Sequence, residues 1–375
     1  MNKLNLLLSV AIVAVLTSCS NNDDKNDSPK PTLNVPTSYD STGYGANTVA
    51  EAAVRTNLRS FVSEIQKGRS AANTLDATVL QSKFSNIKSL VPAAYASKVE
   101  GWIVDIAAAS GKYYLPAATV TGEGGVYSTV SGAAYLFDET GIEPEQLVEK
   151  GLFSAMLYNY AIKLLNAELT TADVDRTVAI YGASPVFPNT NTASKTQFPD
   201  AFSALYAARR DKNDGNGFYT LNRDAFIKLK AAVAAGKDYE AERKEAIATI
   251  KANWEKSSAA TVINYCKDGR TKIALNTDAD NASALHSLSE AVGFTLGWKQ
   301  VAQSDRIITD AQIDEVLALL NAEDGKTSTF YLFVTDGPNQ IQKLQTVIEK
   351  LQSIYGFTAE QVNDFGSNWI TVQSR

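Results

Sequence analysis

The sequence predicts an all-α protein made of two helical bundles, with a short irregular or hairpin insertion. Three observations support this fold class. Apolar residues recur with helical spacing through most of residues 48–366. Strands and helices do not alternate along the chain, which excludes doubly wound folds. One segment, residues 112–135, is rich in Gly, Thr, Val and Tyr and predicts a loop or short hairpin. Helices without a sheet to cover them must pack on one another, as in a bundle.

The first bundle is predicted over residues 47–182. Its helices are recognised by apolar stripes, by proline in a first turn and by glycine after a last turn. The strongest begins at Glu143 and Pro144 and carries Leu147, Phe153 and Leu157 on one face. The expected helices span residues 49–67, 76–84, 92–109, 143–165 and 171–181.

The second bundle is predicted over residues 183–375 and begins with a long polar loop, residues 183–199. Loops of that length are uncommon unless they are functional or mobile. Residues 211–217 invite comparison with a calcium loop, but glycine stands fifth and not sixth, so a surface turn is favoured. Residues 329–334 are apolar and fit a strand or a buried helix. The expected helices span residues 202–210, 222–235, 238–265, 281–301, 310–320, 338–355 and 358–365.

The N-terminus has the pattern of a lipoprotein signal peptide over residues 1–18. A short basic start precedes an apolar run, Leu4 to Leu16, too short for a membrane anchor. The run ends in Leu-Thr-Ser-Cys19, which resembles the bacterial lipobox, whose cysteine is lipidated. An ordinary cleaved signal peptide is the alternative. Residues 19–46 are predicted to form the lipidated cysteine and a flexible tether, because their start is polar and charged.

The N-terminal pattern also predicts a location. The acidic residues after Cys19 resemble surface-export signals of Bacteroidetes lipoproteins, although a solvated spacer would look the same. We therefore expect an outer-membrane lipoprotein that faces the cell surface or the periplasm, with the membrane as partner through its lipid anchor.

Charge and cysteine content exclude two classes of interaction. The net charge of −6 argues against nucleic acid as a partner, because phosphate binding needs a basic surface. Lipidation of Cys19 would leave Cys266 without a partner, so no intrachain disulfide is expected. Cys266 is instead expected to be buried in the core near a helix end.

The candidate binding site centres on the only histidine. His286 and Glu290 are four residues apart, so a helix places imidazole and carboxylate on one face. The same face continues through Gly293 and Gly297, so another helix can approach closely. A ligand site and a hydrogen-bonded pair within a packed helix interface both fit this pattern.

Glu143 and Gln146 are the second pair of candidates. Both lie at the start of a predicted helix, where a carboxylate is favoured by the positive helix end. Helix capping therefore explains them, and the alternative is that they face His286 from across the two bundles. Sequence spacing does not distinguish these two interpretations.

Three common catalytic and nucleotide-binding motifs are missing from the sequence. It contains no His-Glu-x-x-His, no phosphate-binding glycine loop and no Gly-x-Ser-x-Gly. His286 and Glu290 are candidate ligands of a metal ion or haem, but two ligands are fewer than the four of a structural metal site.

Three stretches resemble an imelysin-like family of uncharacterised Bacteroidetes lipoproteins, a domain of unknown function. The stretches are residues 141–152, residues 226–255 with Trp254 and Glu255, and residues 284–294 with a His…Ser-Glu-Ala-x-Gly-Phe pattern. The wider imelysin group carries Gly-x-His-x-x-Glu, whereas here the spacing is one residue longer. The family's His-Trp-containing middle stretch is also absent, because residues 175–202 lack both residue types.

The resemblance implies two bundles related by duplication, a site near their junction and a link with iron or haem acquisition. The resulting hypothesis is a non-catalytic binding lipoprotein for iron, haem or another nutrient, with a small ligand or an outer-membrane protein as partner. The alternatives are a surface scaffold or adhesin without a small-molecule site, and a peptidase-like hydrolase with Glu290 as base. A glycan-binding helical-repeat lipoprotein is disfavoured because its repeat pattern is not found.

Overall fold

The computed structural model describes residues 30–114, 124–128, 133–190 and 200–375. The predicted signal peptide, Cys19 and the first part of the tether lie outside the described residues. The described part is mainly α-helical and contains one two-stranded sheet, which confirms the predicted fold class. Residues 33–375 form one compact unit. The division into bundles at residues 182 and 183 stays a prediction.

The chain joins the compact unit before the first predicted helix. Within the segment expected to be tether, Tyr39 is buried and its hydroxyl donates to Asp175, at 2.5 Å. Lys230 donates to the carbonyl of Asp40, at 2.6 Å, and also pairs with Asp175. The compact unit therefore begins at Leu33, within the predicted tether, and the buried ring of Tyr39 holds this segment against the core.

The first helices follow their apolar stripes. Asp76 begins one of them by accepting a hydrogen bond from the amide of Thr78, the usual role of aspartate at this position. This helix runs to Lys88, four residues beyond the predicted end at residue 84, because Ile87 is also buried. The elements are α1 (Tyr44–Asn47), α2 (Val49–Gln66), the 3-10 turn η1 (Lys67–Arg69), α3 (Ala77–Lys88) and α4 (Ala93–Ala109).

The predicted insertion contains an antiparallel hairpin. Strand β1 (Gly125–Ser128) pairs with β2 (Ala134–Phe137), with Val126 opposite Leu136 and Tyr127 opposite Tyr135. The alternative of a wholly irregular loop is therefore wrong for these residues. The hairpin matters for the site because β2 presents Tyr135.

The long helix predicted over residues 143–165 is continuous but not uniform. It consists of α5 (Pro144–Leu152), a π-helical stretch η3 (Phe153–Tyr158) and α6 (Asn159–Leu165). Helix α7 (Thr171–Tyr181) then opens with a capping box between Thr170 and Asp173, and ends at Gly182 with φ +99°.

The remaining helices confirm the second half of the prediction, with shifted ends. Helix α9 begins at Phe218 and not residue 222, and α10 continues to Leu275, ten residues past its predicted end. The elements are α8 (Phe202–Arg209), α9 (Phe218–Ala235), η4 (Lys237–Tyr239), α10 (Glu240–Leu275), α11 (Asp278–Trp298), η5 (Gln303–Asp305), α12 (Asp310–Leu319), α13 (Leu332–Thr335), α14 (Gly337–Tyr355), α15 (Ala359–Asp364) and α16 (Trp369–Val372).

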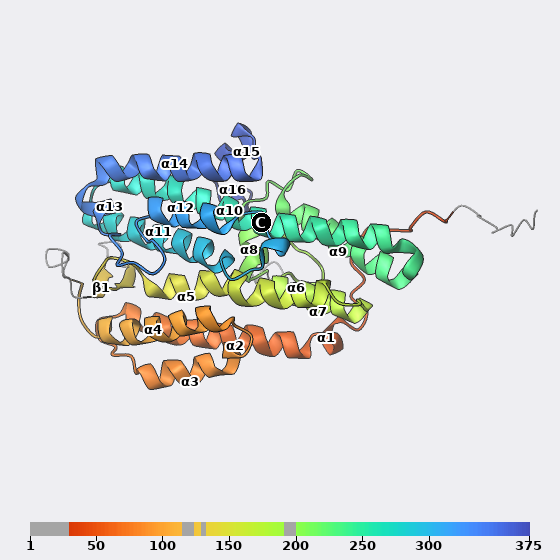
Figure 1. Ribbon diagram of the computed structural model, residues 1–375, viewed down its shortest axis with the longest axis horizontal. Coiled ribbons are helices and arrows are strands. Elements are labelled where there is room, and N and C mark those ends of the chain that lie inside the picture. Colours follow the sequence, from red (N-terminus) through yellow and green to blue (C-terminus); the bar gives the residue numbers. More distant parts are fainter. Residues whose placement is uncertain (1–29, 115–123, 129–132, 191–199) are drawn as a thin grey trace, which may run out of the picture. The chain divides into compact units, whose positions relative to one another are not determined.

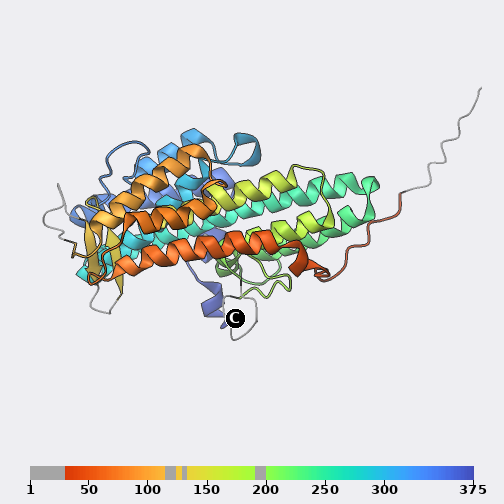
Figure 2. The same ribbon diagram turned by 90° about the horizontal axis from the view of Figure 1, so that it is seen from below.

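Two helices organise the packing. Helix α10 lies against α9, α11 and α14, and α11 lies against α5. In Figure 1, α5 and α6 run between α2–α4 on one side and α10–α14 on the other, and Figure 2 shows the same helices turned by 90°. The contact between α5 and α11 therefore joins residues from the two predicted bundles. None of the helices in the described ranges is long and apolar enough to cross a membrane.

Candidate functional site

The candidate site lies where the first turns of α5 meet the middle of α11. A Cβ atom at Gly293 would lie 2.3 Å from the carbonyl oxygen of Gln146, and one at Gly297 would lie 2.4 Å from the carbonyl oxygen of Gly151. Both distances are far inside van der Waals contact. Glycine at these positions is therefore what allows the two helix backbones to approach. The close approach expected at Gly293 and Gly297 is present, and the approaching helix is α5.

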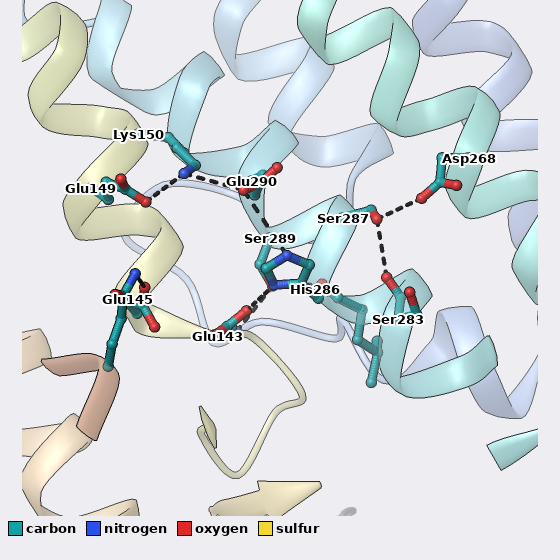
Figure 3. A network of polar contacts seen from close by, with 12 residues as sticks. Glu143, Glu145, Glu149, Lys150, Asp268, Ser283, His286, Ser287, Ser289 and Glu290 are labelled. Carbon is teal, nitrogen blue, oxygen red and sulfur yellow. Dashed lines mark hydrogen bonds and ion pairs between the residues drawn. The ribbon is translucent and has the colours of Figure 1, made fainter. Parts of the chain in front are cut away.

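His286 is held by Glu143 from the opposite helix. Its Nδ1 lies 2.5 Å from Oε2 of Glu143 (Figure 3), and the side chain of Glu143 is completely buried. Burial opposes ionisation of Glu143, but the charges of His286 and Arg69 outweigh it and lower the pKa of this carboxyl. Because an ionised carboxylate can only accept hydrogen bonds, Nδ1 is the donor. Glu143 thus fixes the orientation of the imidazole and leaves Nε2 for other contacts.

Tyr135 covers one face of the imidazole. The two rings are stacked, with centroids 4.2 Å apart and planes 17° from parallel. The His286 side chain nevertheless keeps 20% of its surface exposed, so solvent or a ligand can reach it. Its Nε2 lies 4.0 Å from Oε1 of Glu290, beyond hydrogen-bonding distance. In the described part of the chain, this nitrogen therefore has no direct hydrogen bond.

Glu290 is paired with a lysine of α5. The Nζ atom of Lys150 lies 3.1 Å from Oε1 of Glu290 and also pairs with Glu149. Burial raises the pKa of Glu290 and Lys150 opposes that effect. Burial also disfavours the charge of Lys150, but Glu149 and Glu290 outweigh it and raise its pKa. The expected hydrogen-bonded pair of His286 and Glu290 is not formed, because α5 brings each of them a closer partner of opposite charge.

Gln146 and Arg69 connect these two pairs. The Gln146 amide, oriented to satisfy its neighbours, donates to Oε1 of Glu290 at 3.1 Å and accepts from Nη2 of Arg69 at 2.8 Å. The same Nη2 lies 2.9 Å from Oε1 of Glu143, although that oxygen lacks a well-directed hydrogen bond. Arg69 also donates from Nε to Glu145, at 2.8 Å. All four candidate residues therefore belong to one network of charges.

Helix capping does not explain Glu143. Its side chain makes no capping hydrogen bond at the start of α5 and is directed to His286 instead. Its backbone amide donates to Oγ of Ser289 at 3.0 Å, which ties the start of α5 to α11. Of the alternative interpretation, the geometry shows one half: Glu143 faces His286, whereas Gln146 contacts Glu290 and Arg69.

Among the candidate residues, Nε2 of His286 is the atom best placed to bind a metal, because it makes no direct hydrogen bond in the described chain. Among the described residues, no group of three or more His, Cys, Asp or Glu side chains is placed to hold a metal ion. Glu143 and Glu290 are engaged by Arg69 and Lys150, so these residues do not fit a resident metal ion. Haem brings its own four nitrogen ligands and needs one axial ligand from the protein, so the single Nε2 of His286 suits haem better.

Several members of the network were not predicted. Lys150 follows Gln146 by four residues, so it lies on the same helix face and the spacing would have revealed it. Arg69 and Tyr135 come from a 3-10 turn and a hairpin, and no local pattern links either residue to His286. Glu145 is buried beside Arg69, where helical spacing alone would have suggested an exposed position.

Comparison with known proteins gives one family match. Residues 179–358 match the family described as Domain of unknown function (DUF4856). The matched part includes His286 and Glu290, but not Glu143 or Gln146. It confirms the relation to an uncharacterised family for this part of the chain, whereas the imelysin-like relation stays a prediction. No curated protein and no solved structure is significantly similar to the chain.

Proposed function

We propose that the protein is a lipid-anchored, non-catalytic binding protein for nutrient acquisition, and that Nε2 of His286 contacts the ligand. The orientation and accessibility of the His286 imidazole support a role in ligand binding. The ring is oriented by a fully buried carboxylate, partly exposed, and free of a direct hydrogen bond at Nε2 within the described chain. A histidine with a carboxylate on its other nitrogen is the usual arrangement of a ligating histidine.

The ligand we propose is haem, as the imelysin-like resemblance also suggests. A carboxylate on Nδ1 would make Nε2 a stronger electron donor to a haem iron.

Haem titration of protein without a histidine tag tests this function. The Soret band should shift and saturate with wild type, and His286→Ala should lose the shift while keeping its fold by circular dichroism. The variant Gln303→Ala, on a turn away from α5, serves as the control and should bind as wild type does. Equal haem binding by wild type and His286→Ala would refute the role of this residue. Parallel calorimetry with Fe²⁺ and Zn²⁺ should give no saturable binding.

The second candidate is a scaffold whose network only stabilises the fold. It is favoured by the ion pairs that join the helices, in which Arg69 contacts Glu143 and Lys150 contacts Glu290. It predicts that wild type shows no saturable Soret shift, and that His286→Ala lowers the melting temperature.

The proposed location is the outer membrane, with anchoring through lipidated Cys19 and an outer-membrane protein as partner. The lipobox-like residues before Cys19 and the polar residues after it support this proposal. Cys19→Ser should move the protein from the detergent phase to the aqueous phase after expression in a bacterium that processes lipoproteins. Unchanged partitioning of the variant would contradict lipidation.

A further inference from the structure

A second candidate site adjoins the first, because its lining includes Asp268, which accepts a hydrogen bond from Ser287 (Figure 3), and Tyr206, whose ring centre lies 5.3 Å from Nζ of Lys150. A pocket of about 440 Å³ is formed by the end of α8, the middle of α10 and the segment before α16. Its lining includes Arg209, Arg210 and Lys267, together with the aromatic side chains of Tyr206 and Tyr265. His286, Glu143 and Glu290 are not part of this lining.

None of the three cations of this pocket forms a salt bridge within the described chain, although the charge of Asp364 acts on Lys267 and partly opposes the lowering of its pKa by burial. The contacts found for them are to neutral groups. Arg210 donates to the carbonyl of Phe365 at 2.5 Å, Lys267 donates to the carbonyl of Asn363 at 3.3 Å, and the Arg209 guanidinium lies 4.9 Å from the ring centre of Tyr206. Most other cations at this depth in the protein, such as Arg69 and Lys150, are paired with carboxylates.

Arg210 is the strongest indication that the pocket can accept an anion. It is only 7% exposed, and its Nε has no hydrogen-bond partner. The Nε atom of Arg209 is also buried without a partner. Burial, with the adjacent charge of Arg209, lowers the pKa of Arg210 to about 9. Because a buried charge without compensation is costly, an anion in the pocket would stabilise this arrangement.

The one acidic residue in the lining does not provide that compensation. Asp268 is already bound by Lys272, at 2.5 Å, and accepts a hydrogen bond from Ser287 at 2.6 Å. The pocket therefore remains positively charged, although the whole chain has a net charge of −6.

We propose that this pocket binds the phosphate group of a small organic phosphate. A phosphate monoester carries between one and two negative charges near neutral pH and has three strong acceptor oxygens. Arginine guanidinium groups match these oxygens in geometry, and lysine adds a point charge. The space beyond the phosphate is bordered by Tyr206 and Tyr265, whose rings offer a surface to the organic part.

Isothermal calorimetry in a low-salt buffer without phosphate tests the proposal. The probes are inorganic phosphate, phenyl phosphate and succinate, and the protein is residues 20–375 without a histidine tag. Phosphate and phenyl phosphate should both bind, phenyl phosphate more tightly, and affinity should fall as salt rises. The double variant Arg209→Gln/Lys267→Gln should weaken binding at least about tenfold, since each lost contact is a charge-assisted hydrogen bond.

The control is chosen to separate the pocket from general charge effects. Lys256→Gln changes a cation on the same helix, α10, outside the pocket lining, and should bind as wild type does. Arg210 is left intact in the double variant, so its bond to Phe365 persists and the C-terminal segment stays packed.

Absence of phosphate binding by wild type would overturn the proposal, and so would equal binding by wild type and the double variant. Tighter binding of succinate than of phenyl phosphate would overturn the assignment to phosphate. Because these variants leave His286 unchanged, failure here is distinguishable from failure of haem binding.

Discussion

The imidazole of His286 and the carboxylate of Glu143 are 143 positions apart in the chain and 2.5 Å apart in space. One group lies on α11 and the other at the start of α5, so their contact links the two halves of the protein. Oxygen Oε2 of Glu143 reaches Nδ1 of the ring, and Glu290, on the histidine's own helix, comes no closer than 4.0 Å to Nε2. The contact between helices, and not the spacing within one helix, determines how the histidine is held.

The first prediction concerns the protonation of this ring. Because Glu143 is acceptor-only when ionised, the neutral imidazole should carry its proton on Nδ1. The chain has a single histidine, so ¹⁵N-histidine labelling gives one pair of ring signals that reports the tautomer directly. Glu143→Ala should remove this preference. If the neutral imidazole of the wild-type protein carried its proton on Nε2, the hydrogen bond from Nδ1 to Glu143 would be contradicted.

The second prediction concerns Glu290. Glu290→Ala leaves Lys150 buried with only Glu149 as partner, and loss of one member of a buried pair costs about 3 kcal/mol. Urea unfolding should show this loss as a lower midpoint with an unchanged slope. Glu168→Ala, at an exposed position, is the control and should stay within about 0.5 kcal/mol of wild type. An equal midpoint for both variants would show that the ion pair contributes nothing measurable.

The third prediction tests the helix crossing without removing a charge. Gly293→Ala places a Cβ atom 2.3 Å from the carbonyl oxygen of Gln146, so α5 and α11 must separate. We expect a loss of about 1–3 kcal/mol in the free energy of unfolding. Gly101→Ala is the matched control, because its Cβ would meet nothing within 4 Å in the middle of α4. Thermal unfolding should show that the free energy of unfolding of this control rises by up to about 1 kcal/mol. If Gly293→Ala proved as stable to unfolding as Gly101→Ala, the close approach of α5 and α11 would be refuted.

The fourth prediction is a pH dependence from Glu145. Burial, together with the charges of Glu143 and Glu149, raises the pKa of Glu145 from 4.5 to about 8, although Arg69 opposes the shift. Between these values the folded protein binds more protons than the unfolded chain, so stability falls as the pH rises from about 4.5 to about 8.

The variant Glu145→Gln keeps the size of the side chain and removes its titration. Urea unfolding from pH 5 to pH 8 should therefore show a smaller decline for the variant than for wild type. Some decline should remain, because burial also raises the pKa of Asp138 and of Asp200 to about 7. Parallel curves for the two proteins would show that Glu145 keeps the same pKa on folding.

The sequence by itself determined the fold class and most helices, because helical periodicity and end signals act over a few residues. It also indicated that a helix would approach α11 at Gly293 and Gly297, because two glycines four residues apart leave one helix face without side chains. Where helix ends were misplaced, as at Leu275, the chain continues as a helix because its late residues, such as Ile273, are still buried against neighbours.

The tertiary structure alone decided which groups meet. Tyr135, on a hairpin, stacks on His286, and Arg69, on a 3-10 turn, contacts Tyr135 and Glu143. Lys150, on α5, pairs with Glu290, which lies on the same helix as the histidine. Charge pairing inside a protein depends on distances of a few ångströms between segments remote in sequence, and burial strengthens whichever pair is closest. Spacing along one helix can therefore identify a candidate residue, but it cannot name its partner.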